Sequence, residues 1–235
     1  MDEKGRLAIL TNVYTGKPIK SSGRGFIVID YLRDNKSANQ YLSDLSHSDI
    51  IYSPFNLCIF EPKANHGYEA MYFKNTFKDE SNGVVIQGDG PKLLSPGVSG
   101  FGNHPISEPY RKTTFGIDAF KNIVERNLDD DNLVEEIIKL MSNTQHMYPD
   151  KQMQKQSGLE KTCLLAENES EEIKWMLDKE KLLSSIFVDM GDTYGTRMQT
   201  LIFVDFKHNV KFVERTRSSN TPLKWDVKTF NFQFH

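Results

Sequence analysis

The chain has 235 residues, 38% of them hydrophobic, which is enough to bury the core of one domain. Charged residues make up 26% of the chain but leave a net charge of only −3, so the sequence lacks the basic bias of proteins that bind nucleic acid or anionic membranes. Two cysteines are too few for a disulfide framework, and no apolar run approaches the roughly 20 residues needed to span a bilayer.

The N-terminal part of the chain predicts strands around one helix. Residues 6–12 form a short apolar run ended by polar residues, which is typical of a buried strand. The apolar run at residues 26–32 leads into an amphipathic stretch, residues 37–45, that we interpret as helical. Three short apolar runs separated by Gly, Pro and Asn then predict a meander of strands, at residues 56–60, 69–73 and 83–86.

The middle of the chain predicts a turn followed by two helices. Three glycines and a His-Pro pair between residues 93 and 105 indicate extended chain that turns sharply. Apolar residues recur at i, i+4 and i+8 from Phe115 to Ile123, the spacing of one helical face. A run of three aspartates at residues 129–131 precedes the apolar periodicity of residues 133–141, which places carboxylates at the positive end of a second helix.

The C-terminal part of the chain returns to strands after a polar stretch. Residues 144–181 are rich in Gln, Lys and Glu, and we expect a divergent surface insertion there with a charged helix over residues 171–183. Strands are predicted over residues 201–204, 210–213 and 227–234, the last with phenylalanines at the two-residue period of a half-buried strand. Strands, then helices, then strands favour an antiparallel α+β fold.

Six short segments, in a fixed order, carry a resemblance to a known family. They are Gly5-Arg6-Leu7-Ala8-Ile9-Leu10-Thr11-Asn12, Ser22-Gly23-Arg24-Gly25, Phe55-Asn56-Leu57, Ser99-Gly100-Phe101-Gly102-Asn103 with Pro109-Tyr110-Arg111-Lys112, Leu182-Leu183-Ser184-Ser185-Ile186-Phe187, and Tyr194-Gly195-Thr196-Arg197 with Thr200. In these segments the chain resembles the Transport and Golgi organization 2 homolog family, whose domain is named after an Asn-Arg-Asp-Glu motif. The resemblance covers about residues 5–234.

The resemblance implies a fold, and it identifies family segments that are not found in this chain. Family members resemble N-terminal-nucleophile hydrolases, with two stacked, mainly antiparallel sheets flanked by helices in an αββα order. We therefore expect residues 1–235 to form a single domain of this α+β class. The family's opening Met-Cys, its Asn-Arg-Asp-Glu motif and a Gly-Gly-Thr-Trp segment are not found here, where Asp2 follows Met1. We expect an N-terminally incomplete domain that lacks central strands and the nucleophile.

The same resemblance places Asn12, Asn103 and Arg197 around one ligand pocket. An asparagine amide there would donate to a developing oxyanion, and the arginine would pair with a carboxylate. The residue types by themselves leave simpler interpretations open. An asparagine that ends a strand, such as Asn12, commonly serves a turn, Asn103 before His-Pro is equally ambiguous, and Arg197 before an apolar strand could form a rim ion pair.

Other chemistry-bearing residues favour structural interpretations. Glycines at 97, 100 and 102 do not have the Gly-x-Gly-x-x-Gly spacing of a phosphate loop, so a turn is expected. His104 and His146, with Met141 and Met147 nearby, could be haem axial ligands, but a lone His or Met seldom is. Cys58 and Cys163 lie in apolar surroundings and are expected to be buried thiols.

The resemblance implies a non-catalytic factor that supports Golgi organization, protein secretion and haem or lipid homeostasis. It would act in the cytoplasm, at the Golgi or in mitochondria. Its expected ligand is haem or an acyl lipid, with haem transported rather than held as a cofactor; no nucleic-acid partner, metal site or transmembrane segment is expected. The alternative is a cysteine-nucleophile amidohydrolase whose nucleophile segment is absent from this chain. A third interpretation is a truncated chain that folds poorly, and we expect marginal stability.

Overall fold

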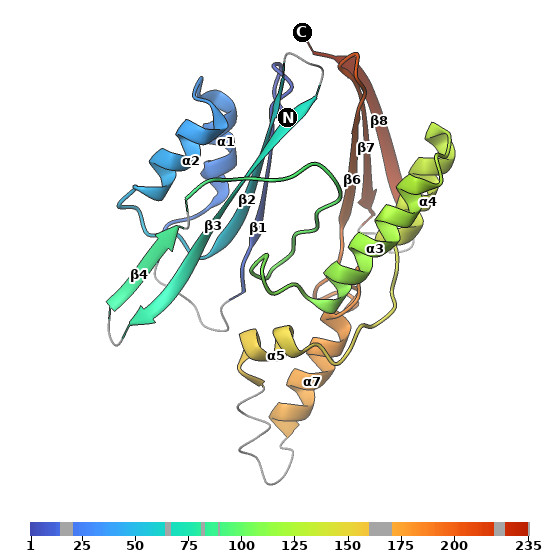
Figure 1. Cartoon of the computed structure of the whole chain (residues 1–235). Coiled ribbons are helices and arrows are strands. Elements are labelled where there is room, and N and C mark those ends of the chain that lie inside the picture. Colours follow the sequence, from blue (N-terminus) through green and yellow to red (C-terminus); the bar gives the residue numbers. More distant parts are fainter. Residues whose placement is uncertain are drawn as a thin grey trace.

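The computed structural model describes residues 1–14, 21–63, 67–80, 83–88, 90–159, 171–218 and 224–234. Within them the chain forms two antiparallel sheets with helices on their outer sides (Figure 1). The first sheet has the order β1-β2-β3-β4, with β5 also paired to β3, and the second has the order β6-β7-β8. The predicted α+β class with two mainly antiparallel sheets is therefore confirmed.

The elements follow the predicted order along the chain. The first sheet contains β1 (Leu7–Asn12), β2 (Phe55–Pro62), β3 (Tyr68–Glu80), β4 (Gly83–Gly88) and β5 (Lys92–Leu93). The second contains β6 (Met198–Val204), β7 (Asn209–Arg217) and β8 (Trp225–Gln233). The helices described are α1 (Gly25–Arg33), α2 (Ala38–Ser46), α3 (Arg111–Glu125), α4 (Asp130–Met141), α5 (Lys151–Ser157) and α7 (Glu171–Leu183). None of these helices combines the length and hydropathy needed to cross a membrane.

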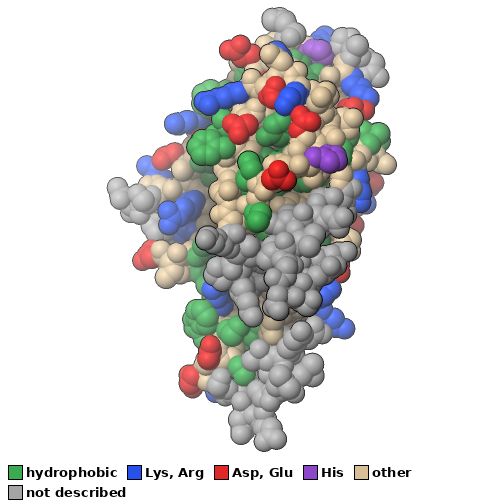
Figure 2. Space-filling model, turned by 90° about the vertical axis from the view of Figure 1, so that its left-hand side faces the viewer, with side chains coloured by type: hydrophobic (Ala, Val, Ile, Leu, Met, Phe, Trp, Pro, Cys, Tyr) green, Lys and Arg blue, Asp and Glu red, His purple; other side chains and the backbone are tan. Residues whose placement is uncertain are grey.

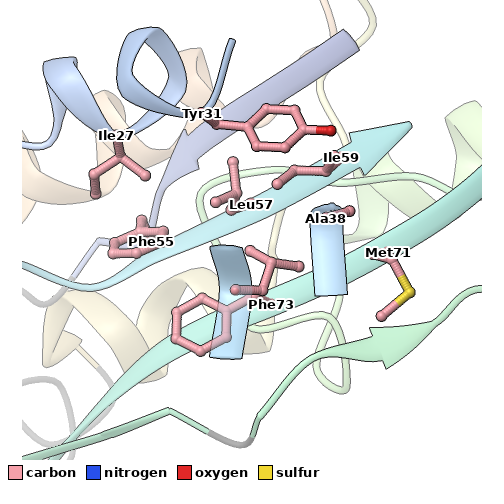
Figure 3. Packing of buried hydrophobic residues seen from close by; sticks show 9 residues of the cluster. Ile27, Tyr31, Ala38, Phe55, Leu57, Ile59, Met71 and Phe73 are labelled. Carbon is pink, nitrogen blue, oxygen red and sulfur yellow. The ribbon is translucent and has the colours of Figure 1, made fainter. Parts of the chain in front are cut away.

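The first core lies between the first sheet and the helices α1 and α2. Alternate residues of β2, Phe55, Leu57 and Ile59, point at the helices and are fully buried (Figure 3). The apolar run at residues 26–32, which the sequence left unassigned, is the helix α1. It is helical because Ile27 and Tyr31, one turn apart, both pack on the sheet.

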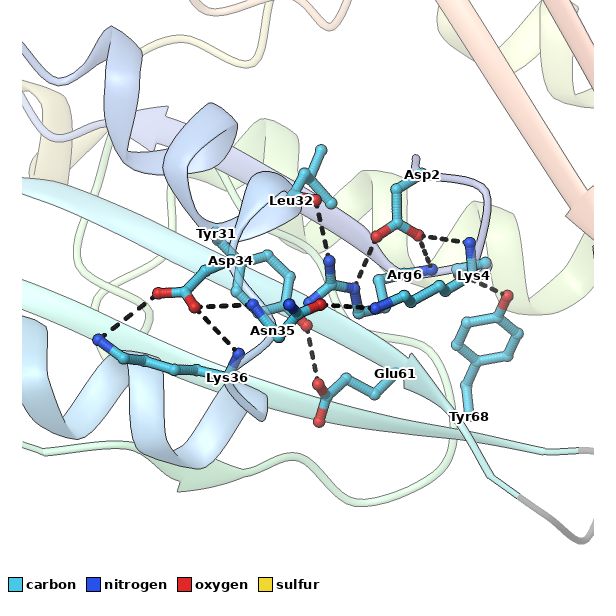
Figure 4. Close-up of polar contacts among 11 residues, drawn as sticks. Asp2, Lys4, Arg6, Tyr31, Leu32, Asp34, Asn35, Lys36, Glu61 and Tyr68 are labelled. Carbon is cyan, nitrogen blue, oxygen red and sulfur yellow. Dashed lines mark hydrogen bonds and ion pairs between the residues drawn. The ribbon is translucent and has the colours of Figure 1, made fainter.

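The N-terminal turn is bound to this core by polar contacts (Figure 4). The Arg6 guanidinium pairs with Asp2 at 2.6 Å, donates to the Leu32 carbonyl at 2.9 Å and lies over the ring of Tyr31. The Tyr31 hydroxyl donates to Glu61 on β2. Burial, and then the bond to Glu61, raises the pKa of the Tyr31 hydroxyl above its usual range. These contacts fix the start of β1 against α1 and β2.

The second core lies between the second sheet and the helices α3 and α4. Ile123 and Ile137 from the helices meet Leu201 and Val213 from the strands. Helix α4 begins where the aspartate run predicted, since Asp129 accepts a hydrogen bond from the Asn132 backbone N–H.

The prediction of a half-buried strand at residues 227–234 is wrong for two of the three phenylalanines in that range, both of which lie in β8. Phe234 is 4% exposed, but Phe230 and Phe232 are 51% and 43% exposed. The two-residue period itself holds, because these side chains share one face of the strand. They are exposed because β8 is the last strand of its sheet and α3 and α4 pack on the opposite face.

The stretch at residues 144–181 contains more buried structure than its composition indicated. Helix α7 confirms the helix predicted at residues 171–183. A second short helix, α5, begins at the Asp150 cap and ends at Gly158 with φ +78°. The buried apolar side chains of this region are Met147, Met153, Leu159 and Ile173. Residues 160–170, with Cys163, lie outside the described residues, and the assignment of residues 144–181 as an insertion stays a prediction.

Candidate functional site

Asn12 and Asn103, two of the three expected pocket residues, lie on neighbouring stretches of backbone. The Thr11 hydroxyl donates to the Gly102 carbonyl at 2.9 Å, and the Tyr14 N–H donates to the Asn103 carbonyl at 3.1 Å. The end of β1 therefore runs beside residues 102 and 103. Both asparagine side chains are exposed at this point. The structure thus brings the two residues close in backbone, at the surface.

The amide that is buried beside them belongs to Asn56, which sequence reasoning did not single out. Asn56 is 2% exposed, and its Nδ2 donates to the carbonyls of Gly102 and His104 at 3.1 and 2.8 Å. Its Oδ1 accepts from the Tyr72 hydroxyl at 2.7 Å. A polar residue inside the apolar strand at residues 55–60 was the signal that could have identified it, because a buried amide needs partners.

His104 is the centre of a buried set of contacts at the start of α3. Its Nδ1 lies 2.9 Å from the Pro105 carbonyl, so this nitrogen must carry the hydrogen and donate. Its Nε2 then accepts from the Thr113 hydroxyl at 2.8 Å. Burial lowers the pKa of the imidazole, which favours this neutral form. With both nitrogens bonded, His104 has no free nitrogen for a haem iron.

Three further ionisable side chains gather where α3, α5 and α7 meet. The Lys112 ammonium donates to the carbonyls of Leu183 and Ser185 at 2.7 and 3.1 Å, which binds the end of α7 to the start of α3. Burial lowers the pKa of Lys112 to about 8, against the opposing effect of Asp150. Asp150 accepts from the Arg111 N–H at 2.6 Å and from two N–H groups of α5.

Glu180 completes this group of side chains. It is buried, and neither carboxylate oxygen makes a hydrogen bond of good geometry in the described part of the chain, although the Asp150 N–H and the Gln154 side chain lie near enough to oppose the rise of its pKa. Burial is the main cause that raises the pKa of Glu180 to about 7, and the nearby Asp150 charge adds to it. Lys112 and Glu180 therefore both titrate close to neutral pH, a property that is common at functional sites and also occurs in structural ion networks.

Arg197, the third expected pocket residue, lies just before β6 with an exposed side chain. Its backbone carbonyl accepts from the Arg217 N–H at 2.8 Å. It is Arg217, which the sequence did not indicate, that forms an ion pair with Asp189 at 3.3 Å. In the contacts that the described residues make, the Arg197 side chain is not joined to Asn12 or Asn103. A pocket shared by all three stays a prediction.

The cysteine that the structure describes is not an activated nucleophile. Cys58 lies on β2, on the face opposite the helices α1 and α2, and is 3% exposed. Burial raises the pKa of its thiol to about 12, so the thiolate is scarce at neutral pH. Groups of three His, Cys, Asp or Glu side chains that could hold a metal ion are absent among the described residues.

Comparison with known proteins decides the family. A family model described as Transport and Golgi organisation 2 matches residues 1–219. The chain belongs to the Transport and Golgi organisation 2 family. It is 29% identical over 233 residues to the Transport and Golgi organization protein 2 homolog of Bos taurus, covering 98% of this chain and 75% of that protein. The human homolog is 28% identical with 97% and 75% coverage, and Transport and Golgi organization protein 2 of Drosophila melanogaster is 25% identical with 92% and 68%.

In this member of the Transport and Golgi organisation 2 family, several of the resembling segments meet in one network. Asn56 of Phe55-Asn56-Leu57 binds the segment at residues 99–103, and Thr11 of the first segment binds it from β1. Lys112 of Pro109-Tyr110-Arg111-Lys112 binds the carbonyls of the segment at residues 182–187. Gln156 of α5 adds bonds to the carbonyls of Tyr14 and Asn103. We call this set of contacts the junction network.

Proposed function

We propose that this chain is a non-catalytic factor of Golgi organisation and protein secretion that binds haem or an acyl lipid. It acts in the cytoplasm, at the Golgi or in mitochondria. The observation that carries the proposal is the match of the Transport and Golgi organisation 2 family model over residues 1–219. The names of the relatives indicate a role in transport and Golgi organisation, and the chemistry of the described side chains supports a binding role over a catalytic one.

The polar groups of the junction network, and His104 and Asp150 beside it, support a structural role. Lys112 donates to two carbonyls, Asp150 accepts from three backbone N–H groups, and both nitrogens of His104 are bonded. These contacts satisfy helix ends and buried loops, which is what such groups do in a scaffold. The described thiol, Cys58, is buried and protonated at neutral pH. An acyl-transfer mechanism needs a nucleophile bonded to a base, and these groups do not supply one.

A hollow at one end of the second sheet suits an amphipathic ligand. Its volume is about 630 Å³, within the range of small-molecule sites. Its apolar lining consists of Val134, Phe203, Val204, Val210 and Phe232, and its polar lining of Asp130, Asp205, Asn209, Lys211 and Asn231. Lys211 offers an ammonium to a fatty-acid carboxylate or a haem propionate, because its pairing with the exposed Asp131 is long, at 3.4 Å.

The ligand is tested by titrating the purified chain with haemin, followed by absorbance, and with a fluorescent fatty acid. We expect saturable binding of one of them, weakened about tenfold by Lys211→Glu and by Phe232→Ser. The matched controls are Lys121→Glu and Phe26→Ser, which alter exposed residues outside the hollow. Equal binding by all four variants, or no saturable binding of either ligand, overturns the assignment of the hollow.

The cellular role is tested by expressing the chain in cells depleted of their own family member. We expect secretion of a reporter and Golgi morphology to be restored. Comparable expression without restoration contradicts the proposed role. Assay of simple amide substrates addresses the amidohydrolase alternative, for which we expect no turnover. Turnover that Arg197→Ala abolishes would show that the chain is an enzyme after all.

A further inference from the structure

The outer edge of β8 carries backbone groups that have no partner strand among the described residues. At the two ends of the strand, Lys224 accepts from the Ser218 N–H at 3.1 Å, and the Phe234 N–H donates to the His208 carbonyl at 3.4 Å. Both residues therefore face β7. The register between β7 and β8 is continuous, so the even-numbered residues between them also bond to β7. The odd-numbered residues point their N–H and C=O groups away from the sheet; they are Trp225, Val227, Thr229, Asn231 and Gln233.

The bonds on the other side of β7 agree with this assignment. The Arg217 N–H donates to the Arg197 carbonyl, and the Asn209 carbonyl accepts from the Asp205 N–H. Odd-numbered residues of β7 thus face β6, which leaves its even-numbered residues for β8. Since β8 ends the order β6-β7-β8, its outward groups have no strand beside them in the described part of the chain.

Helix α4 leaves one half of this edge open. The N-terminal end of α4 lies over the start of β7, where Asp131 forms an ion pair with Lys211. Its C-terminal end lies over β6, where the Met141 carbonyl accepts from the Gln199 side chain at 2.8 Å. These two contacts place the helix obliquely across the sheet, away from the first half of β8. Val227 in that half is 56% exposed, although it is β-branched and apolar.

The charged side chains on the open half of β8 would face opposite charges in a second copy of the chain related by a two-fold axis. Asp226 and Lys228 flank Val227, are both exposed, and form no ion pair within the described residues. Glu214 lies opposite Lys228 across the β7–β8 ladder without pairing. If a second β8 runs antiparallel with Val227 opposite Val227, Asp226 of each copy lies opposite Lys228 of the other. Val227 and its counterpart then exchange their two outward hydrogen bonds.

We propose that two copies of this chain associate through their β8 strands, antiparallel about Val227, so that the second sheet continues from one copy into the other. An edge strand with unpaired backbone groups and an apolar outward residue is a template for such pairing. The occupant is a second copy because the charge pattern of β8 complements its own reverse. Closed two-fold pairing uses each edge once, so the assembly stops at a dimer.

The experiment measures the mass of the intact chain by sedimentation across a range of concentrations. We expect a dimer, and we expect Asp226→Lys or Lys228→Asp to raise its dissociation constant about tenfold, because each change sets like charges opposite each other twice. The double variant Asp226→Lys with Lys228→Asp restores the opposite charges and should restore the dimer. The matched control, Asp49→Lys, changes the net charge by the same amount as Asp226→Lys, at an exposed site in the first half of the chain. It should leave the dissociation constant unchanged.

A second variant tests the backbone bonds independently of charge. Thr229→Pro removes an N–H that points outward and keeps the bonds to β7, so it should dissociate the dimer while circular dichroism stays unchanged. A chain that is monomeric at all concentrations overturns the proposal. A dimer that resists Thr229→Pro also overturns it, and a dimer that responds to Thr229→Pro but not to the single charge reversals overturns the axis at Val227.

Discussion

At the scale of single residues, Glu180 links the stability of the chain to pH. Its pKa is raised from an unfolded value of 4.5 to about 7, so the folded state binds the proton more tightly. Its contribution to folding is complete below about pH 4.5 and is lost as the pH rises through 7. We expect Glu180→Gln to stabilise the chain at pH 8 by roughly 2 kcal/mol relative to the unchanged protein, since the amide needs no proton.

The measurement for Glu180 is urea unfolding of both proteins at pH 5.5 and pH 8. The stabilisation by Glu180→Gln should be smaller at pH 5.5, where only part of the Glu180 contribution has been lost, and larger at pH 8. The other groups that face Glu180 include Asp150 and Tyr110, which are shared by both proteins and cancel in the comparison. A difference that does not change with pH contradicts the burial effect on this carboxyl group.

At the scale of elements, Asp150 joins the first turns of two helices. It accepts from the Arg111 N–H at the start of α3 and from the Gln152 and Met153 N–H groups of α5. We expect Asp150→Ala to lower the free energy of unfolding by about 3 kcal/mol, because one buried and two partly buried N–H donors lose their partner. Asp150→Asn, which keeps one acceptor oxygen, should lose less.

An exposed cap that serves a single helix, α2, is the control for Asp150. Ser37 accepts only from the Gln40 N–H, at 3.3 Å, and Ser37→Ala should cost about 1 kcal/mol. Thermal or urea unfolding compares the variants. Equal losses for Asp150→Ala and Ser37→Ala would show that Asp150 acts as an ordinary cap and does not join α3 to α5.

At the scale of the whole molecule, Phe234 connects the two sheets. It follows β8 of the second sheet, yet its ring packs edge-on against Tyr68 of the first sheet and stacks on His208. Gly5 lies under the ring with φ +78°, where an added Cβ would come within 2.5 Å of Phe234. Only glycine tolerates both that backbone conformation and that close approach.

Phe234→Ala should therefore lower the free energy of unfolding by about 3 to 4 kcal/mol. It should also separate the unfolding of the two sheets, which calorimetry would detect as a broadened or double transition. Phe206→Ala, which changes a phenylalanine that is 80% exposed, should have little effect. A single sharp transition with unchanged stability in Phe234→Ala would show that other contacts hold the sheets together.

The face of the molecule shown in Figure 2, where it is described, agrees with the weak net charge. Figure 2 shows acidic and basic side chains intermixed on the visible face, with hydrophobic side chains between them. Mixed charge of this kind gives no field of one sign to attract a polyanion. The expectation that nucleic acid is not a partner rests on the same balance in the sequence.

The sequence by itself determined the positions of most strands and helices, because hydrophobic period and caps act over a few residues. The strand β1, the meander of β2, β3 and β4, and the helices α3, α4 and α7 lie where the pattern predicted. The order of six short segments determined the family, which the family model confirmed. The local pattern did not decide the structure of the short apolar run at residues 26–32, which forms α1, because a run of that length suits a strand or a helix equally.

Only the tertiary structure decided which of these residues are buried and what they contact. It placed Asn12, Asn103 and Arg197 with exposed side chains and enclosed Asn56 beneath the segment at residues 101–104. It also exposed Phe230 and Phe232, whose spacing predicted a half-buried strand. The physical reason is that period fixes the face on which a side chain lies, whereas burial depends on the element that packs across that face, and that element comes from a distant part of the chain.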